Sequence, residues 1–244
     1  MTERKKHQGV LNIIRFNWPF YLGGLFAVFG LYIIALFLQP LVTILPFVIL
    51  IMMMISLLVS WYIYDLSGIY KIKWLDELKG KVLIINAGFD EISPLIRKKF
   101  SQVHLTVADF YDEKLMTEPS IKRARKIYPL EKEAKKVLIG NLKVTENYDR
   151  VLLFFAAHEI RKESDRIIFF KELNRITSDK GEIYIIEHLR DWKNFLAYTI
   201  GFLHFHSKKT WKRAFLKGDF SLKEEIKLTP FVSLFKIKKN GNSS

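Results

Sequence analysis

The sequence predicts an α/β domain with a largely parallel β-sheet, preceded by a pair of membrane-spanning helices. Three observations support this fold class. No Asp, Glu, Lys or Arg occurs in the 49 residues between Arg15 and Asp65. After Gly80, apolar runs alternate with amphipathic stretches, which is typical of a parallel sheet with helices on both faces. The last two apolar runs flank Thr229-Pro230 and predict a terminal antiparallel pair.

The charge-free tract divides into two spans. Trp18–Leu38 and Leu41–Tyr64 are each long enough to cross a bilayer, which takes about 20 residues. Gln39-Pro40 separates them, and proline favours a turn there. A cleaved signal peptide is a poorer interpretation, because the tract is too long and a second span follows directly. A buried helical pair in a soluble protein is also disfavoured by so many uncharged residues.

Basic residues set the expected orientation of the two spans. Lys and Arg occur before the first span and after the second, whereas the turn has no positive charge. The positive-inside rule therefore predicts an integral protein of the inner (cytoplasmic) membrane, with both termini and the globular domain in the cytoplasm. The expected divisions are a basic N-terminus (1–17), a transmembrane hairpin (18–64), a linker (65–80), the α/β domain (81–239) and a tail (240–244).

The composition limits which binding partners and which kinds of site the protein can have. The net charge of +14 favours nucleic acid or anionic lipid as a binding partner. Beside a membrane span we expect lipid, since each basic residue gains about 1 kcal/mol near an anionic leaflet, and we expect no nucleic acid. The chain has no cysteine, which excludes disulfides and thiolate metal sites. Its six histidines are scattered without an HExxH-type spacing, so we expect no metal site.

The elements of the α/β domain follow from the apolar runs in order. The expected parallel strands are Val82–Asn86, Val103–Ala108, Lys136–Ile139, Arg150–Phe155 and Glu182–Ile186, and the antiparallel pair is Glu225–Leu228 with Phe231–Lys238. The expected helices are Ile92–Phe100, Thr117–Tyr128 and Ser164–Ile176. Ligands of open α/β sheets bind at the carboxyl ends of the strands, so the functional residues are expected there.

The first strand and its turn read VLIINAGFD, from Val82 to Asp90. This segment resembles the VLEIGCGTG motif of the class I S-adenosylmethionine-dependent methyltransferases, and the resemblance extends over about residues 81–239. Gly88 matches the central glycine, whereas Asn86 and Asp90 replace the outer two and Ile84 replaces the acid. Asn tolerates positive φ and can serve the turn. The resemblance implies that Asn86 and Gly88 contact S-adenosyl-L-methionine.

Two further strand ends are similar to the family's cofactor-binding positions. VADFYDEKL carries Asp109, which lies 21 residues after Gly88, and the resemblance implies that its carboxylate accepts the ribose hydroxyls. A helix-capping role is the alternative for this aspartate. Asn141 follows the third run, where the family often has a side chain that reaches the adenine.

Candidate catalytic and substrate-binding residues follow the later strands. In YDRVLLFFAAHEIR, His158 and Glu159 come after the fourth strand, where the family has a histidine that faces the substrate. A hydroxyl acceptor would need such a base. KELNRITSDKGEIYIIEHLRD is similar to the segment that leads into the fifth strand, and it places Glu187 and His188 toward the pocket. His204, in GFLHFHSKKTW, lies in the segment that covers the substrate in related enzymes.

Together these features favour a membrane-anchored methyltransferase that uses S-adenosyl-L-methionine. A hydrophobic or amphipathic acceptor, such as a lipid or quinone, suits the anchor, and the domain resembles the ubiquinone/menaquinone type. Two alternatives stay open. The first alternative is a catalytically silent, membrane-tethered binding or scaffold protein, which the glycines and the acid missing from the first-strand motif favour. The second alternative is a Rossmann-type enzyme that uses a dinucleotide, although a pyrophosphate prefers a fuller glycine pattern. The oligomeric state is unknown.

Overall fold

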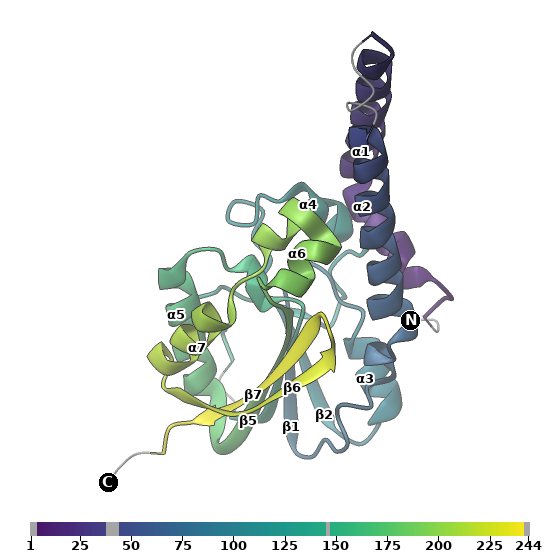
Figure 1. The fold of residues 1–244 in the computed structure, drawn as a ribbon. Coiled ribbons are helices and arrows are strands. Elements are labelled where there is room, and N and C mark those ends of the chain that lie inside the picture. The colour runs from purple at the N-terminus through teal and green to yellow at the C-terminus, as the bar shows by residue number, and fades with distance from the viewer. Residues whose placement is uncertain (1–3, 38–43, 145–146, 242–244) are drawn as a thin grey trace.

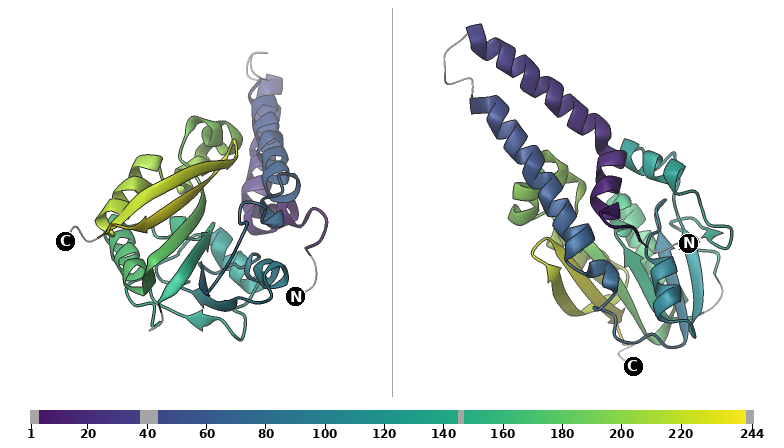
Figure 2. Two further views of the ribbon diagram at one scale, coloured as in Figure 1. Left: turned by 90° about the horizontal axis from the view of Figure 1, so that it is seen from below. Right: turned by 90° about the vertical axis from the view of Figure 1, so that its right-hand side faces the viewer.

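The computed structural model describes residues 4–37, 44–144 and 147–241 of the chain. A globular α/β domain carries two long helices, which lie side by side and project away from it (Figures 1 and 2). These helices, α1 (Gln8–Phe37) and α2 (Ile44–Trp61), are called the stem. The expected turn at Gln39-Pro40 lies outside the described residues.

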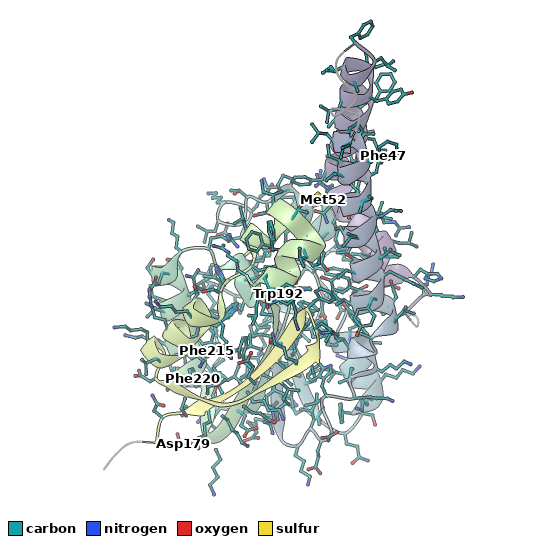
Figure 3. The ribbon with its side chains drawn as sticks, viewed as in Figure 1. Phe47, Met52, Asp179, Trp192, Phe215 and Phe220 are labelled. Carbon is teal, nitrogen blue, oxygen red and sulfur yellow. The ribbon has the colours of Figure 1, made fainter. Side chains whose placement is uncertain are left out.

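The stem is apolar and largely uncovered. By length and composition, both of its helices are long and apolar enough to cross a membrane. Most of the stem stands clear of the domain (Figure 3), and Phe29 and Phe47 are 65% and 64% exposed. Soluble monomeric proteins rarely expose such large apolar surfaces. The stem therefore needs an apolar environment or a partner around it.

The first stem helix is bent close to the domain. It begins at Gln8, ten residues before the expected Trp18, and Asn17 has non-helical φ and ψ of −119° and 16°. Pro19 cannot donate an intrahelical hydrogen bond, which is a common cause of a kink. Below the kink, Phe16 is buried. The first turns of α1 thus belong to the globular body, and only the remainder projects.

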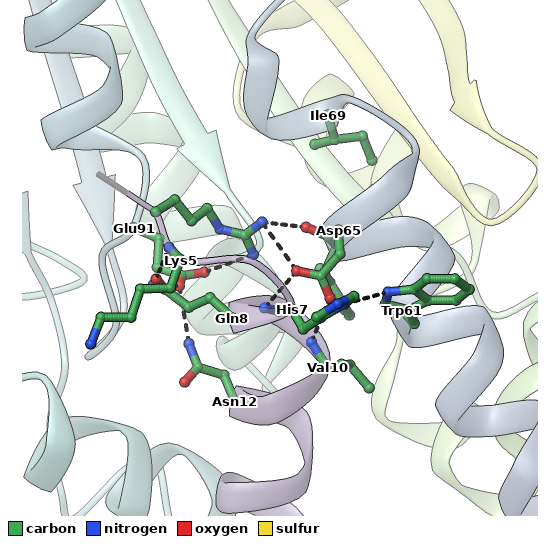
Figure 4. Close-up of polar contacts among 12 residues, drawn as sticks. Lys5, His7, Gln8, Val10, Asn12, Trp61, Asp65, Ile69 and Glu91 are labelled. Atoms are coloured by element: carbon green, nitrogen blue, oxygen red, sulfur yellow. Dashed lines mark hydrogen bonds and ion pairs between the residues drawn. The ribbon is translucent and has the colours of Figure 1, made fainter. Parts of the chain in front are cut away.

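A buried charge network fastens the start of α1 to the end of α2 (Figure 4). The two carboxylate oxygens of Asp65 accept hydrogen bonds from the Gly9 and Val10 amides, at 2.8 and 2.9 Å. Asp65 therefore caps the N-terminus of α1, where a negative charge is favourable. Arg4 lies between Asp65 and Glu91, 3.6 Å from each carboxylate. This network joins the N-terminal segment, the stem and the α/β domain.

Within the described ranges, seven strands form one sheet in the order β3-β2-β1-β4-β5-β7-β6 (Figure 1). The strands are β1 (Lys81–Asn86), β2 (His104–Asp109), β3 (Lys135–Lys136), β4 (Tyr148–Phe154), β5 (Thr177–His188), β6 (Phe220–Thr229) and β7 (Val232–Lys239). β1 to β5 are parallel, and β7 runs antiparallel between β5 and β6. The predicted parallel sheet with a terminal antiparallel pair is confirmed.

Three strands differ in extent from their predictions. β5 begins at Thr177, five residues before the predicted start at Glu182. β3 has only two residues, because the chain turns back where Leu138 and Asn141 pair in an isolated bridge. β6 begins at Phe220, five residues before the predicted start at Glu225. Its first half is partly charged and lies at the edge of the sheet, where a strand needs no continuous apolar run.

Helices cover both faces of the sheet. They are α3 (Ser93–Lys99), α4 (Pro119–Ile127), α5 (Glu163–Ile176), α6 (Trp192–Tyr198) and α7 (Lys208–Lys217), with short helical turns η2 (Tyr62–Leu66), η3 (Ile69–Lys71), η4 (Ala157–Glu159) and η5 (Thr199–His204). Alternate residues of β1 point to opposite faces. Leu83 and Ile85 pack in the core beneath α5 and α7, and Val82 and Ile84 pack in the core beneath α3.

The segment expected as a linker, residues 65–80, is part of this second core. Ile69, Ile72, Leu75 and Leu78 are all buried there, against β1 and β4. Burying a large aliphatic side chain contributes about 1.5–3 kcal/mol. The stem is consequently connected to the sheet by packed chain instead of a free tether, so its direction relative to the sheet is fixed.

Candidate active site

The residues expected to contact the cofactor meet at the carboxyl ends of β1 and β2. Asn86 and Asp109 end these strands and lie opposite each other in register. Gly88, in the turn after β1, has φ of +92°, a conformation that favours glycine. With Asp90 and Arg125 they line a small pocket. β1 has β2 on one side and β4 on the other, so the pocket is at the reversal of strand order, where open α/β sheets bind ligands.

The carboxylate of Asp109 is buried and already has partners. It accepts hydrogen bonds from the amides of Gly88, at 3.2 and 3.3 Å, and of Tyr111, at 2.8 Å. Arg125 from α4 forms an ion pair with it. The ring of Tyr111 covers Gly88, because a Cβ added there would lie 2.8 Å from the ring. Arg125 and Tyr111 therefore occupy the surface that a cofactor would contact.

Asn141, the candidate for adenine contact, lies in the turn after β3 and is exposed. Its side-chain oxygen accepts a hydrogen bond from the Lys143 amide at 3.0 Å. The neighbouring Leu142 amide donates to Glu172 of α5 at 3.3 Å. The side chain of Asn141 thus serves a local turn in this structure, and its role toward a cofactor stays a prediction.

A second group of candidate residues lies at the carboxyl ends of β4 and β5. His158, in η4 just after β4, has its Nδ1 2.7 Å from Oε2 of Glu187. The backbone amide of His158 donates to Oε1 of the same carboxylate at 3.1 Å. Glu187 is the penultimate residue of β5 and is fully buried. Both carboxylate oxygens therefore fix the position of His158 and direct its Nε2 away from the sheet.

The chain brings a second histidine to the same place. His204, at the end of η5, has its Nδ1 2.9 Å from Glu118, the residue that precedes α4. Its Nε2 is 3.6 Å from Oε1 of Glu159, and Nε2 of His158 is 3.5 Å from that same oxygen. The two imidazole rings are 4.9 Å apart. These five residues, His158, Glu159, His204, Glu187 and Glu118, are called the His–Glu cluster.

Charge governs the protonation of the cluster. Burial would lower the pKa of His158, but Glu187 and Glu159 outweigh it and raise that pKa to about 10. Burial would raise the pKa of Glu159, but the charged rings of His158 and His204 beside it hold that pKa far below its usual value. The pKa of His204 is raised, because Glu118 and Glu159 outweigh the effect of burial. At neutral pH Glu159 is therefore ionised, and a metal-free His158 keeps its proton.

His188, predicted to bind substrate, faces the other way. Successive residues of a strand point to opposite faces, so His188 is turned away from the cluster that Glu187 joins. Its Nε2 is 2.8 Å from the Tyr64 hydroxyl, and its Nδ1 is 3.2 Å from the Asn194 side-chain oxygen. Burial lowers the pKa of His188 to about 3. The neutral ring therefore accepts from Tyr64 and donates to Asn194.

Four residues of these sites were not expected from the sequence. Glu118, Arg125, Tyr111 and Tyr64 each contact a candidate residue through the fold alone. Glu118 and Arg125 lie in a basic helical stretch with no motif, and Tyr64 was expected only as the last residue of the second span. Their roles follow from which segments the sheet brings together, and no local pattern could have found them.

No protein-family model and no curated protein matches the sequence. Solved structures do match the domain. A SAM-dependent methyltransferase from Aquifex aeolicus is 15% identical, with a TM-score of 0.51 and coverage of 71% of this chain and 93% of that one. A glycopeptide N-methyltransferase complexed with S-adenosyl-L-methionine is 7% identical, with a TM-score of 0.50 and coverage of 71% and 94%.

The fold is that of the class I methyltransferases. The similarity to these structures lies in the course of the backbone. What the side chains at the carboxyl ends of the strands can bind follows from their own chemistry. Asp109 fits a ribose, because an ionised carboxylate only accepts hydrogen bonds and ribose hydroxyls donate them. Gly88 keeps the turn after β1 free of a side chain. A cofactor at this site would either contact Arg125 and Tyr111 or displace them.

Proposed function

We propose that the chain is a membrane-anchored, S-adenosylmethionine-dependent methyltransferase that acts on a lipid, a quinone or another hydrophobic small molecule. The observation that carries this proposal is the pairing of two sites on adjacent strands of one sheet edge. Asn86 and Asp109 are the last residues of β1 and β2, and Gly88 lies in the turn after β1. The His–Glu cluster lies at the carboxyl ends of β4 and β5. β1 and β4 are hydrogen-bonded neighbours in the sheet. One site suits a nucleoside and the other suits an acceptor.

In this proposal Asp109 holds the ribose hydroxyls, and Asn86 and Gly88 line the path of the methionine part. S-adenosyl-L-methionine supplies, when bound, a methyl group on a sulfonium. Methyl transfer is an in-line displacement, so the protein contributes mainly by positioning the two reactants. The ring of Tyr111 covers Gly88, so Tyr111 would border the methionine part of the cofactor.

The His–Glu cluster would receive the acceptor. We expect ionised Glu159 to orient a hydroxyl acceptor by accepting its hydrogen bond, because its Oε2 is buried without a hydrogen-bond partner among the described residues. A carboxylate whose pKa is held far below its usual value is a weak base, and His158 is no base in the metal-free protein while its pKa of about 10 keeps it protonated. The charge of His158 stabilises ionised Glu159. A nitrogen or carbon acceptor has less need of this carboxylate.

The stem and the segment after β5 support a hydrophobic acceptor. α6 lies beside the stem, above the ends of the strands (Figure 1). Trp192, labelled in Figure 3, is 67% exposed, and Leu196 and Ile200 are 58% and 74% exposed. Apolar side chains at this level would enter the headgroup region if α1 and α2 span the bilayer. By contrast α7 packs inward, with Trp211 and Phe215 buried.

One observation favours the catalytically silent alternative. Arg125 is paired with Asp109, the carboxylate that ribose needs, and Tyr111 covers Gly88. A scaffold protein with a permanently closed pocket would have the same arrangement. The two functions differ in one measurable property, because only the enzyme must bind S-adenosyl-L-methionine.

The test is calorimetric titration of the detergent-solubilised full chain with S-adenosyl-L-methionine, S-adenosylhomocysteine and NAD. The proposal predicts saturable binding of the first two ligands at one site per chain, and no binding of NAD. Binding of NAD alone would favour the dinucleotide enzyme. Binding of none of the three, by a folded protein, would favour the scaffold and overturn the proposed activity.

A further inference from the structure

Three potential metal ligands converge inside the His–Glu cluster. His158, Glu159 and His204 each offer one ligand atom, and the three atoms lie within 4.8 Å of one another. Two of them come from the turn after β4, and the third comes from η5, 45 residues further along the chain. The sequence has no metal motif because this convergence is created by the fold.

The separations are those of ligands around a common ion. Oε1 of Glu159 is 3.5 Å from Nε2 of His158 and 3.6 Å from Nε2 of His204. These distances exceed a normal hydrogen bond, which is about 2.7–3.2 Å. Two ligands bonded at about 2.0–2.1 Å to one tetrahedral zinc are about 3.4 Å apart, close to both values. The two imidazole nitrogens lie within 4.8 Å of each other and would move closer together around the ion.

The outer hydrogen bonds have the arrangement that metal-binding histidines use. Metal-ligating imidazoles commonly donate their second N–H to a carboxylate, which fixes the tautomer and the ring. Nδ1 of His158 is 2.7 Å from Glu187, and Nδ1 of His204 is 2.9 Å from Glu118. Each ring therefore presents Nε2 toward the other ring and toward Glu159. Both rings are pre-oriented by a carboxylate.

An independent observation points to a missing ligand. Glu159 is only 7% exposed, and its Oε2 is buried without a hydrogen-bond partner among the described residues. A buried carboxylate oxygen without a partner is costly, because it loses its hydration and gains nothing in return. A cation that is held near Oε1 between the two imidazoles would supply that partner when the carboxylate binds it through both oxygens.

We propose that His158, Glu159 and His204 form a site for a divalent transition-metal ion, with zinc as the ion that fits best. Two imidazole nitrogens and one carboxylate oxygen form the donor set of a catalytic zinc site, which keeps a fourth position open. Magnesium is a poor fit, since it prefers oxygen ligands in octahedral geometry. If the chain transfers methyl groups as proposed above, the open position would take a hydroxyl or thiol of the acceptor.

Zinc uptake by the full chain in detergent tests the site without any methyl transfer. The protein is stripped with a chelator, dialysed and titrated with Zn²⁺, with Mg²⁺ as a second probe. We expect one zinc per chain and a higher thermal midpoint with zinc, but no effect of magnesium at the same concentration. X-ray absorption should show two imidazoles and a carboxylate oxygen at about 2.0–2.1 Å.

Variants separate the site from adventitious zinc. His204→Gln and Glu159→Gln should lose the bound zinc, and Glu118→Gln should weaken it about 10–100-fold, as outer-shell changes typically do. Glu118 has 43% of its side chain exposed, so this variant should fold. His104→Gln, at the exposed opposite end of β2, is the matched control and should bind like the wild type.

Two results would overturn the metal site. One is a folded wild type that takes up no zinc, which would leave the cluster as a hydrogen-bonded network. The other is equal zinc binding by the wild type, Glu118→Gln and His204→Gln. Neither result bears on S-adenosyl-L-methionine binding, which is measured separately. Conversely, a chain that binds zinc but no cofactor would keep this site and lose the proposed methyltransferase activity.

Discussion

The hydroxyl of Tyr64 lies 2.8 Å from Nε2 of His188 and joins the end of the stem to the end of β5. Tyr64 belongs to η2, the turn that follows α2, whereas the residue before His188 holds the His–Glu cluster. Phe155 and Phe205 stack on the two sides of the imidazole, at 5.1 and 4.7 Å between ring centres. The stem is thus in contact with the strand that carries the candidate site.

Removing this hydrogen bond should weaken the attachment of the stem. Tyr64→Phe leaves a buried imidazole nitrogen without its donor, which costs about 1–3 kcal/mol. We expect a correspondingly lower free energy of unfolding in detergent. Tyr62→Phe is the control, because Tyr62 is 39% exposed on the same turn. Equal stability of the two variants would show that the Tyr64 hydroxyl contributes nothing to the docking.

Gly9 should be irreplaceable where α1 crosses η2. A Cβ at Gly9 would lie 2.3 Å from the Tyr64 Cβ, whereas a Cβ at Gly23, higher in the same helix, would meet nothing within 4 Å. Overpacking of this kind costs about 1–3 kcal/mol. We expect Gly9→Ala to lower the thermal midpoint in detergent and Gly23→Ala to leave it unchanged or raise it. The same midpoint for both variants would contradict the close crossing.

The cofactor site rests most strongly on Asp109. Asp109→Ala should weaken the binding of S-adenosyl-L-methionine by about 1–3 kcal/mol, the usual effect of losing a charged hydrogen-bond partner. Calorimetry measures this, with Asp179→Asn as control, since Asp179 is fully exposed at the far end of the sheet (Figure 3). An unchanged affinity in a folded Asp109→Ala would remove Asp109 from the site.

Strands with continuous apolar runs could be predicted from the sequence. β1 and β4 are buried on both faces, so their continuous apolar runs could be recognised in the sequence. The predicted ends of these strands led to Asn86, Gly88 and His158 as candidate residues. The early start of β6 carried no such signal, because an exposed edge strand alternates with Lys and Glu. The first ten residues of α1 (8–17) were also missed, because Arg15 interrupts the charge-free tract on which the prediction of the span was based.

The long-range contacts of the candidate site could not be predicted. His158 and His204 lie 46 residues apart in the sequence. Only the packing of η5 over the end of β4 brings their ring centres to a distance of 4.9 Å. The pairing of Asp109 with Arg125 crosses from β2 to α4 in the same way. Local sequence determines where a strand ends, but the partners of the residue at that end are set by the packing of distant segments.

The orientation of the stem is open to a direct test. The basic residues flank its outer ends, so a reporter fused after Ser244 should be cytoplasmic, and one inserted after Pro40 should be on the opposite side. Each of the two positions is fused in turn to a reporter that is active only in the cytoplasm and to one that is active only outside. The pattern of activity shows on which side each position lies. An external C-terminal reporter would reverse the proposed topology and place the domain outside.

The most direct measurement of the central claim is the transfer of labelled methyl groups from S-adenosyl-L-methionine to lipid. Membranes of the host that contain the wild-type chain are incubated with the labelled cofactor, and the organic extract is counted. Asp109→Ala and Glu159→Gln membranes, with equal amounts of folded protein, are the controls. We predict label in the extract with the wild type, and about 100-fold less with Glu159→Gln if the acceptor is a hydroxyl that this carboxylate orients. A wild type that binds the cofactor but labels no extractable molecule would contradict a methyltransferase with a hydrophobic acceptor.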